Sequence, residues 1–108
     1  MATADLTVIA LGRAEASASA YIAEIQRRLA AQDKVGYELH AMGTSLEGST
    51  EDILEIVADL HRVPFEMGLP RVYTILKLDE RRDKEQSLSG KVRSVEDRLE
   101  DQTRWRTS

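Results

Sequence analysis

The chain has 108 residues, which suits one domain, and it contains no cysteine, which excludes a disulfide framework, a thiolate nucleophile and a cysteine metal site. Its formal net charge of −4 comes from residues 1–78, because residues 79–108 carry eight acidic and eight basic side chains, and such an acidic body disfavours nucleic acid and anionic membranes as partners. No apolar run approaches the roughly 20 residues of a membrane helix and no signal peptide is visible, so we expect a cytoplasmic protein.

The first part of the chain is predicted to form a strand and then an amphipathic helix. Residues 6–11 are apolar, include β-branched side chains and are followed by Gly12, a pattern that predicts a strand. Ser17 or Ser19 can then cap the first turn of a helix. The apolar residues of this helix recur at helical spacing, at Tyr21, Ile22, Ile25 and Leu29.

Two further strands are predicted before a second helix. Residues 35–41 form one strand, and residues 44–47 form a short strand after a turn near Gly43. Ser49 is expected to cap the second helix. Pro64 should end or kink that helix, because proline lacks an N–H and clashes with the preceding turn. The predicted buried stripe of the helix is Ile53, Ile56, Val57 and Leu60.

The last and longest predicted strand covers residues 71–79 and completes the order β-α-β-β-α-β. This order is typical of a ferredoxin-like antiparallel sheet that has helices on one face only. In the first and last strands, however, both alternating sets of side chains include large apolar groups. We therefore expect the open face of the sheet to pack on another subunit. A few tolerated apolar residues on the surface are the alternative interpretation.

The segment after this strand is charged and then helical. Residues 80–85 are a run of charges typical of a solvated linker, and Ser87 is expected to cap a third helix. The apolar positions of this helix form a narrow seam at Leu88, Val92, Val95 and Leu99. Such a seam suggests a clasp against another subunit or against the sheet edge.

These elements predict the α+β class. A ferredoxin-like βαββαβ sandwich is expected over residues 5–79. Residues 80–108 are expected to form a charged linker and a C-terminal helix that belong to the same domain and serve assembly.

The stretch that most strongly suggests a ligand site covers residues 42–48. Glu47 lies there between two glycines and close to two hydroxyls, after a strand and before a helix. Glycines let a backbone approach a ligand closely, while hydroxyls and a carboxylate supply donors and acceptors. A hairpin turn would use the same residue types, so the stretch gains weight from residues 17–21 upstream and 71–75 downstream. Together they indicate a small-ligand binding module rather than an enzyme.

Catalytic interpretations have less support. Glu38 and His40 share a strand face and could act as a general acid–base pair, although a polar strand face is the more common arrangement. Ser17 and Ser19 would need a base and an oxyanion site to act as nucleophiles. His40 and His61 lack a local ligand spacing, so no metal site, catalytic residue or cofactor is assigned.

Several segments, in this order along the chain, resemble one family. They are Leu11-Gly12 with Ser17-x-Ser19-x-Tyr21-Ile22-Ala23; Tyr37-Glu38-Leu39 through Met42-Gly43-Thr44-x-Leu46-Glu47-Gly48; Arg71-Val72-x-Thr74-x-x-Lys77-x-Asp79-x-Arg81-x-Asp83-Lys84; and Lys91-Val92-x-Ser94-Val95. Over residues 5–95 the chain is similar to the small thiamine-binding protein family. The resemblance implies a ferredoxin-like subunit and a homodimer that assembles as a dimer of dimers. It also implies binding of thiamine or a related pyrimidine, without catalysis, in a pocket near subunit contacts.

Carried over by motif, the resemblance implies that the ligand-binding residues are Ser17, Ser19, Glu38, Met42, Thr44 and Glu47. The Glu47 carboxylate could accept a hydrogen bond from the amino group of the pyrimidine, and Thr44 or Ser19 could satisfy another polar edge. Met42 could supply a soft apolar wall. Glu47 could instead pair with a helix N-terminus, since the second helix starts just after it.

The chain departs from the family pattern at Ala10, where many members have proline, at Pro64, and in the extension over residues 96–108. The leading hypothesis is a cytoplasmic, homo-oligomeric, non-enzymatic binder of thiamine or a similar pyrimidine that serves vitamin salvage or buffering. A second is an oligomeric small-molecule sensor or interaction module with a different ligand. A third is an enzyme that uses Glu38, His40 or Glu47 as acid or base.

Overall fold

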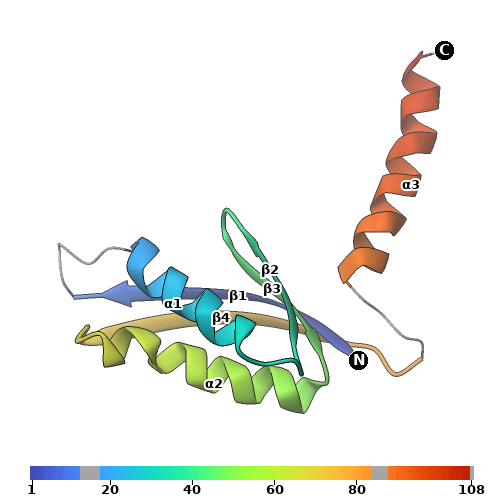
Figure 1. The fold of residues 1–108 in the computed structure, drawn as a ribbon. Coiled ribbons are helices and arrows are strands. Elements are labelled where there is room, and N and C mark those ends of the chain that lie inside the picture. The colour runs from blue at the N-terminus through green and yellow to red at the C-terminus, as the bar shows by residue number, and fades with distance from the viewer. Residues whose placement is uncertain (13–17, 84–87, 108) are drawn as a thin grey trace.

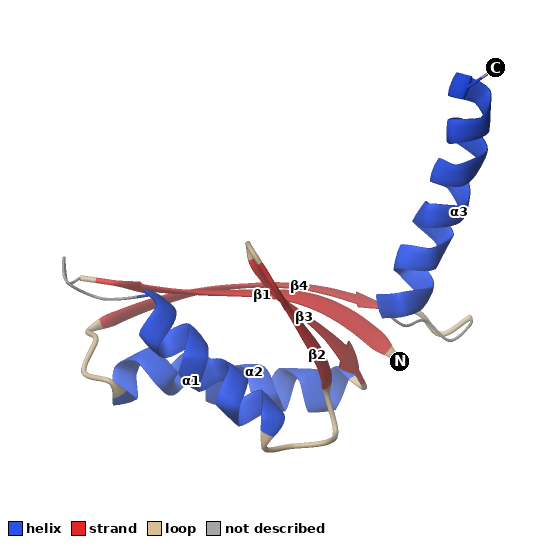
Figure 2. Cartoon of the chain, turned by 45° about the horizontal axis from the view of Figure 1, so that its top comes forward, coloured by secondary structure: helices blue, strands red, loops and turns tan. Residues whose placement is uncertain are grey.

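The computed structural model describes residues 1–12, 18–83 and 88–107, with side chains described as far as residue 99. A four-stranded sheet in the order β2-β3-β1-β4 is covered on one face by α1 and α2 (Figures 1 and 2). The elements are β1 (Ala2–Leu11), α1 (Ala18–Ala30), β2 (Gly36–His40), β3 (Gly43–Gly48), α2 (Thr50–Glu66), β4 (Arg71–Glu80) and α3 (Leu88–Thr107). The predicted α+β class, the βαββαβ order and the C-terminal helix are confirmed.

The antiparallel pairing of β1 sets which side chains share a face. Leu6 of β1 lies opposite Thr44 of β3 and Leu76 of β4. Because side chains alternate along a strand, these three point to the same face, toward the helices. The core lies there and contains Ala2, Ala4, Leu6, Val8, Tyr21, Ile25, Leu29, Val35, Leu46, Ile53, Leu60 and Val63. The other set of side chains faces away from α1 and α2 and forms what we call the open face.

The cap predicted for α2 is confirmed, one of the two candidate caps of α1 is excluded, and α2 continues for two residues past Pro64. Ser49 accepts a hydrogen bond from the Asp52 backbone N–H at 3.1 Å, which satisfies one of the unpaired N–H groups of the first turn. Ser19 lies inside α1 rather than before it, so it is not the cap residue, and Ser17 lies outside the described residues. The helix α2 passes through the buried Pro64 and ends two residues later, because one missing N–H is tolerated in a last turn held by packing.

Polar contacts join the helices to each other and to the sheet. The Arg28 guanidinium of α1 contacts Glu24 on its own helix and reaches Asp59 and Glu66 on α2. At the other end of α2, the Thr50 hydroxyl donates to the carboxylate of Glu80, and this hydrogen bond lowers the pKa of Glu80. Both ends of α2 are thus tied to neighbouring elements.

The C-terminal helix α3 lies on the other side of the sheet and projects away from it (Figures 1 and 2). The radius of gyration is 16.8 Å, whereas a compact domain of about 100 residues has a value of about 13 Å. The projecting helix explains this elongated shape.

The turn between β2 and β3 brings the backbone of β3 unusually close to β1. A Cβ atom at Gly43 would lie 2.5 Å from the Leu6 carbonyl oxygen and 3.0 Å from the Thr7 hydroxyl oxygen. No side chain fits at that separation from a backbone atom. Gly43 is therefore required where the β2–β3 hairpin meets β1.

We expect Gly43→Ala to lower the free energy of unfolding by about 1–3 kcal/mol, the usual cost of overpacking. Urea unfolding followed by circular dichroism measures this. Gly90→Ala is the matched control, because it adds the same methyl group at an exposed position inside α3, where alanine favours the helix by about 1 kcal/mol. Equal effects of the two substitutions would contradict the role of Gly43.

Candidate functional site

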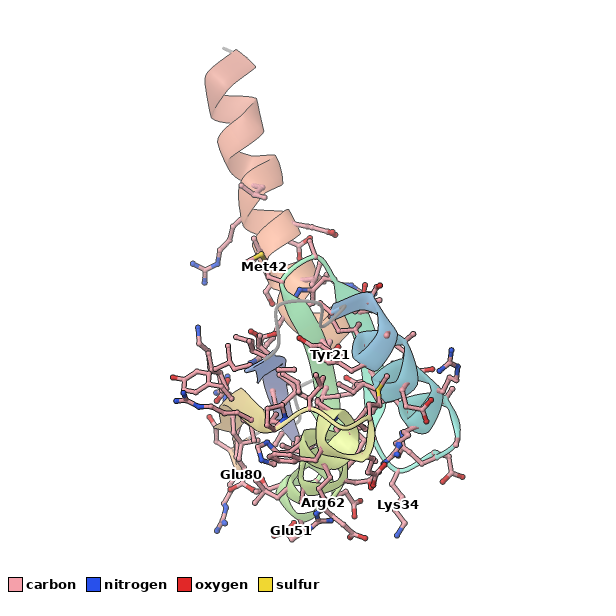
Figure 3. The ribbon with its side chains drawn as sticks, turned by 90° about the vertical axis from the view of Figure 1, so that its left-hand side faces the viewer. Tyr21, Lys34, Met42, Glu51, Arg62 and Glu80 are labelled. Atoms are coloured by element: carbon pink, nitrogen blue, oxygen red, sulfur yellow. The ribbon has the colours of Figure 1, made fainter. Side chains whose placement is uncertain are left out.

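A cavity of about 270 Å³ lies between α1 and the sheet. The α1 side of its lining is formed by Ala18, Tyr21, Ile22, Ile25 and Gln26. The sheet side is formed by residues 6–9 of β1 and residues 39–44 of the β2–β3 hairpin. Figure 3 shows Tyr21 between α1 and the strands and Met42 at the tip of this hairpin. Met42 is 80% exposed and marks the mouth of the cavity.

Few polar groups line this mostly apolar space. The Gln26 side-chain amide donates to the Thr44 hydroxyl oxygen at 3.1 Å. The Tyr21 hydroxyl oxygen accepts from the Ala10 backbone N–H at 3.2 Å. The Thr7 hydroxyl donates to the Met42 carbonyl oxygen at 3.2 Å and holds the hairpin tip against β1. An apolar pocket with a small number of fixed polar groups is typical of a site that binds a small organic ligand.

The structure brings some of the predicted ligand residues to this cavity and places others elsewhere. Met42 and Thr44 line the cavity. Ser19 is exposed in the first turn of α1 and is not among the residues that line the cavity. Ser17 lies outside the described residues.

Glu38 and Glu47 lie on the open face, with the sheet between them and the cavity. The register pairs Glu38 with Ser45, and Ser45 and Glu47 alternate in β3 with the buried Thr44 and Leu46. Within one chain, therefore, neither carboxylate reaches the cavity that Met42 and Thr44 line.

Glu47 instead receives the N-terminus of α3. Its carboxylate Oε2 accepts from the Leu88 backbone N–H at 3.0 Å. A carboxylate at the first turn of a helix satisfies an unpaired N–H and interacts favourably with the helix dipole. The sequence suggested that Glu47 could pair with the N-terminus of the second helix, whereas the structure pairs it with the N-terminus of the third helix, α3.

Glu38 and His40 were the residues considered for acid–base chemistry, and in the structure His40 contacts a different carboxylate, that of Asp5. The His40 Nε2 atom lies 3.2 Å from the Asp5 carboxylate, and both side chains are partly exposed on the sheet. Among the described residues, no group of three or more histidine and acidic side chains could hold a metal ion. In the same part of the chain, no helix is long and apolar enough to span a membrane.

Sequence reasoning missed two polar residues of the cavity. The sequence analysis assigns Tyr21 only to the apolar stripe of a helix and does not single out Gln26, yet both direct a polar group toward the site. The signal was present in the spacing, because Gln26 falls on the same helical face as Ile22 and Ile25. A glutamine beside an apolar stripe can equally face solvent, so spacing alone did not single it out.

Comparison with known proteins points to one family. A family profile described as thiamine-binding protein matches residues 4–96. A UPF0045 protein from Staphylococcus xylosus is 44% identical over 104 residues, which cover 94% of this chain and 97% of the relative. The UPF0045 protein YqgV of Bacillus subtilis is 40% identical over 103 residues, which cover 93% of this chain and 99% of the relative.

Two crystal structures share the fold. A hypothetical protein from Methanocaldococcus jannaschii superimposes with a TM-score of 0.78 at 33% identity, covering 87% of this chain and 94% of that one. A Thermotoga maritima protein, assigned provisionally to thiamine biosynthesis or salvage, superimposes with a TM-score of 0.71 at 20% identity, covering 87% of this chain and 97% of that one.

The anchoring contact of α3 generates a prediction. Glu47→Gln removes the charge that faces the N-terminus of α3, and we expect it to lower stability by about 0.3–1 kcal/mol and to speed amide hydrogen exchange at Leu88. Glu38→Gln is the matched control, because Glu38 is an exposed glutamate on the same face of the neighbouring strand. Unchanged exchange at Leu88 in Glu47→Gln would contradict the anchoring role.

Proposed function

Because the chain belongs to the thiamine-binding protein family, we propose that it binds thiamine or a related aminopyrimidine, without chemical turnover, in the cavity between α1 and the β2–β3 hairpin. The observation that carries this proposal is the Gln26–Thr44 hydrogen bond inside a mostly apolar cavity. The provisional assignment of the Thermotoga maritima structure to thiamine biosynthesis or salvage gives further support.

The chemistry of the cavity matches the two halves of such a ligand. An aminopyrimidine is flat and carries donors and acceptors in its plane, so the Thr44 hydroxyl and the Gln26 amide can satisfy its edge while Ile22 and Ile25 contact its faces. A cavity of about 270 Å³ is near the lower end of the range for ligand sites. We therefore assign the pyrimidine to the cavity and the thiazolium to its mouth.

At the mouth, Met42 offers a polarizable wall to the thiazolium. The thiazolium is a fixed cation, and the excess of acidic side chains in residues 1–78 gives the body of the protein the sign of charge that attracts it. The proposed site is thus built from α1 and one hairpin of the same chain.

The residues that line the cavity favour binding over catalysis. Tyr21 and His40 are the titratable groups among the lining residues. The Tyr21 hydroxyl oxygen accepts from the Ala10 backbone N–H, which fixes its position, and the His40 ring contacts Asp5 on the open face. General acid–base catalysis needs a group within hydrogen-bonding reach of the substrate and free to exchange a proton.

We propose that the protein serves vitamin salvage or buffering.

Thermal unfolding of the purified protein tests the ligand. Thiamine, its phosphates, hydroxymethylpyrimidine and the free thiazole are titrated separately. A ligand at about 100 times its Kd adds about 2.7 kcal/mol to stability, and each 1 kcal/mol raises Tm by about 4–8 °C in a small domain. We expect thiamine and hydroxymethylpyrimidine to raise Tm and the thiazole alone to have little effect. If none of them raises Tm at millimolar concentration, the alternative of a sensor or interaction module with a different ligand is favoured.

Two substitutions in β3 test the site. Thr44→Val keeps the shape of the side chain and removes the hydroxyl, and we expect it to weaken binding about 10- to 100-fold, because a recognised polar group is left unpaired. Ser45→Ala removes a hydroxyl from the adjacent residue on the open face and should leave the affinity unchanged. Isothermal titration calorimetry measures both. Equal affinities for Thr44→Val and the parent protein would remove Thr44 from the site.

A further inference from the structure

The hydroxyl of Tyr21 lies beside the part of β1 that β3 does not reach. The register of β3 with β1 runs only from Ala2 to Leu6. Beyond it, the Ala10 backbone N–H donates to the Tyr21 hydroxyl oxygen at 3.2 Å. Tyr21 is 5% exposed and lines the cavity between α1 and the sheet (Figure 3). A side chain of α1 thus supplies the hydrogen-bond acceptor that the strand edge needs.

This contact fixes the direction in which the Tyr21 hydroxyl can bond. A phenol has one hydrogen to donate and lone pairs that accept. A backbone N–H can only donate, so Tyr21 has to accept from Ala10 and keeps its own hydrogen. Within the described part of the chain, no acceptor takes this hydrogen. Buried hydroxyl groups are nearly always paired, so the Tyr21 hydroxyl is a donor available to a ligand in the cavity.

The Gln26–Thr44 pair does not have a fixed direction. A half-turn of the Gln26 amide exchanges its donor and acceptor groups. With the amide nitrogen toward Thr44, as in the structure, the pair offers a ligand the Thr44 hydrogen and the Gln26 oxygen. After the half-turn, it would offer the Gln26 N–H and a Thr44 lone pair instead. This pair can therefore satisfy ligands with either pattern of donors and acceptors, whereas Tyr21 can satisfy only an acceptor.

We propose that Tyr21 determines the specificity of this site by donating its hydroxyl hydrogen to a ring nitrogen of the ligand, an inference that rests on the proposed function. Tyr21 and Gln26 are five residues apart on α1, which is about 7.5 Å along the helix axis. An aromatic ring with a hydrogen bond of about 2.8 Å on each side has a similar width. A pyrimidine that directs its amino edge at Gln26 and Thr44 therefore presents its second ring nitrogen, N1, to Tyr21.

The proposed contact defines a class of ligands. Heterocycles with an acceptor at this position pair the Tyr21 hydroxyl, whereas ring analogues with a C–H group there leave a buried hydroxyl without a partner. A site built to form a hydrogen bond with its ligand discriminates strongly against an analogue that lacks the bonding group. The site therefore selects the pyrimidine over a pyridine of the same shape.

Isothermal titration calorimetry with two ligands tests the contact. One is hydroxymethylpyrimidine and the other is its pyridine analogue with C–H in place of N1, at a pH where both are uncharged. We expect the parent protein to bind the pyrimidine about 10- to 100-fold more tightly, because the analogue leaves a buried hydroxyl unpaired. In Tyr21→Phe, which keeps the ring, this preference should vanish. Tyr37→Phe is the matched control and should keep the preference, because Tyr37 is an exposed residue of β2 that does not line the cavity.

The four affinities of the parent protein and Tyr21→Phe separate a direct contact from a structural role. If Tyr21→Phe weakens both ligands by the same factor, Tyr21 acts only through Ala10 and the proposal is overturned. Equal affinities of the parent protein for the two ligands would overturn it without any variant. In both cases the protein still binds a pyrimidine, so the proposed function stands. If the parent protein does not bind the pyrimidine, the proposed function fails and this inference fails with it.

Discussion

The alternation of side chains along β1 and β3 is the constraint on which the rest of this structure depends. It sends Leu6, Thr44 and Leu46 toward the helices and Ser45 and Glu47 to the open face. A shift of one residue in the register would exchange the two sets. The close approach at Gly43 opposes such a shift, because a larger residue moved into this position would clash with the Leu6 carbonyl. The cavity and the open face thus owe their composition to the same pairing.

Because of this alternation, residues 42–48 have two separate structural roles, although their sequence suggests a single ligand site. Residues 42–48 are contiguous, and their hydroxyls and carboxylate suggested one site. In the folded chain, Thr44 contributes to the cavity and Glu47 holds the first turn of α3 on the opposite face. The family residues carried onto this chain include both, so a ligand in the cavity of one chain contacts Thr44 but not Glu47 of that chain.

Much of the fold could be predicted from the sequence, because its signals are local. The spacing of Tyr21, Ile25 and Leu29 and the cap at Ser49 depend on neighbours within a few residues, and both agree with the structure. Strand alternation could also have separated Thr44 from Glu47, since residues three apart in a strand face opposite ways. The partner of Glu47 could not be predicted, because Leu88 lies 41 residues away and only the tertiary fold brings it near.

The energetics of α3 connect its anchor to its seam. The ion pair between Lys91 and Asp79 is partly exposed, with side-chain exposures of 43% and 58%, and pairs of this kind contribute at most about 1 kcal/mol. The contact of Glu47 with a helix N-terminus adds a similarly small amount. Helices in folded proteins gain most of their stability from packing an apolar face against other elements. Neither of these two polar contacts buries such a face. The polar anchor therefore sets where α3 begins, while the stability of the helix beyond Lys91 depends on covering Val92 and Val95.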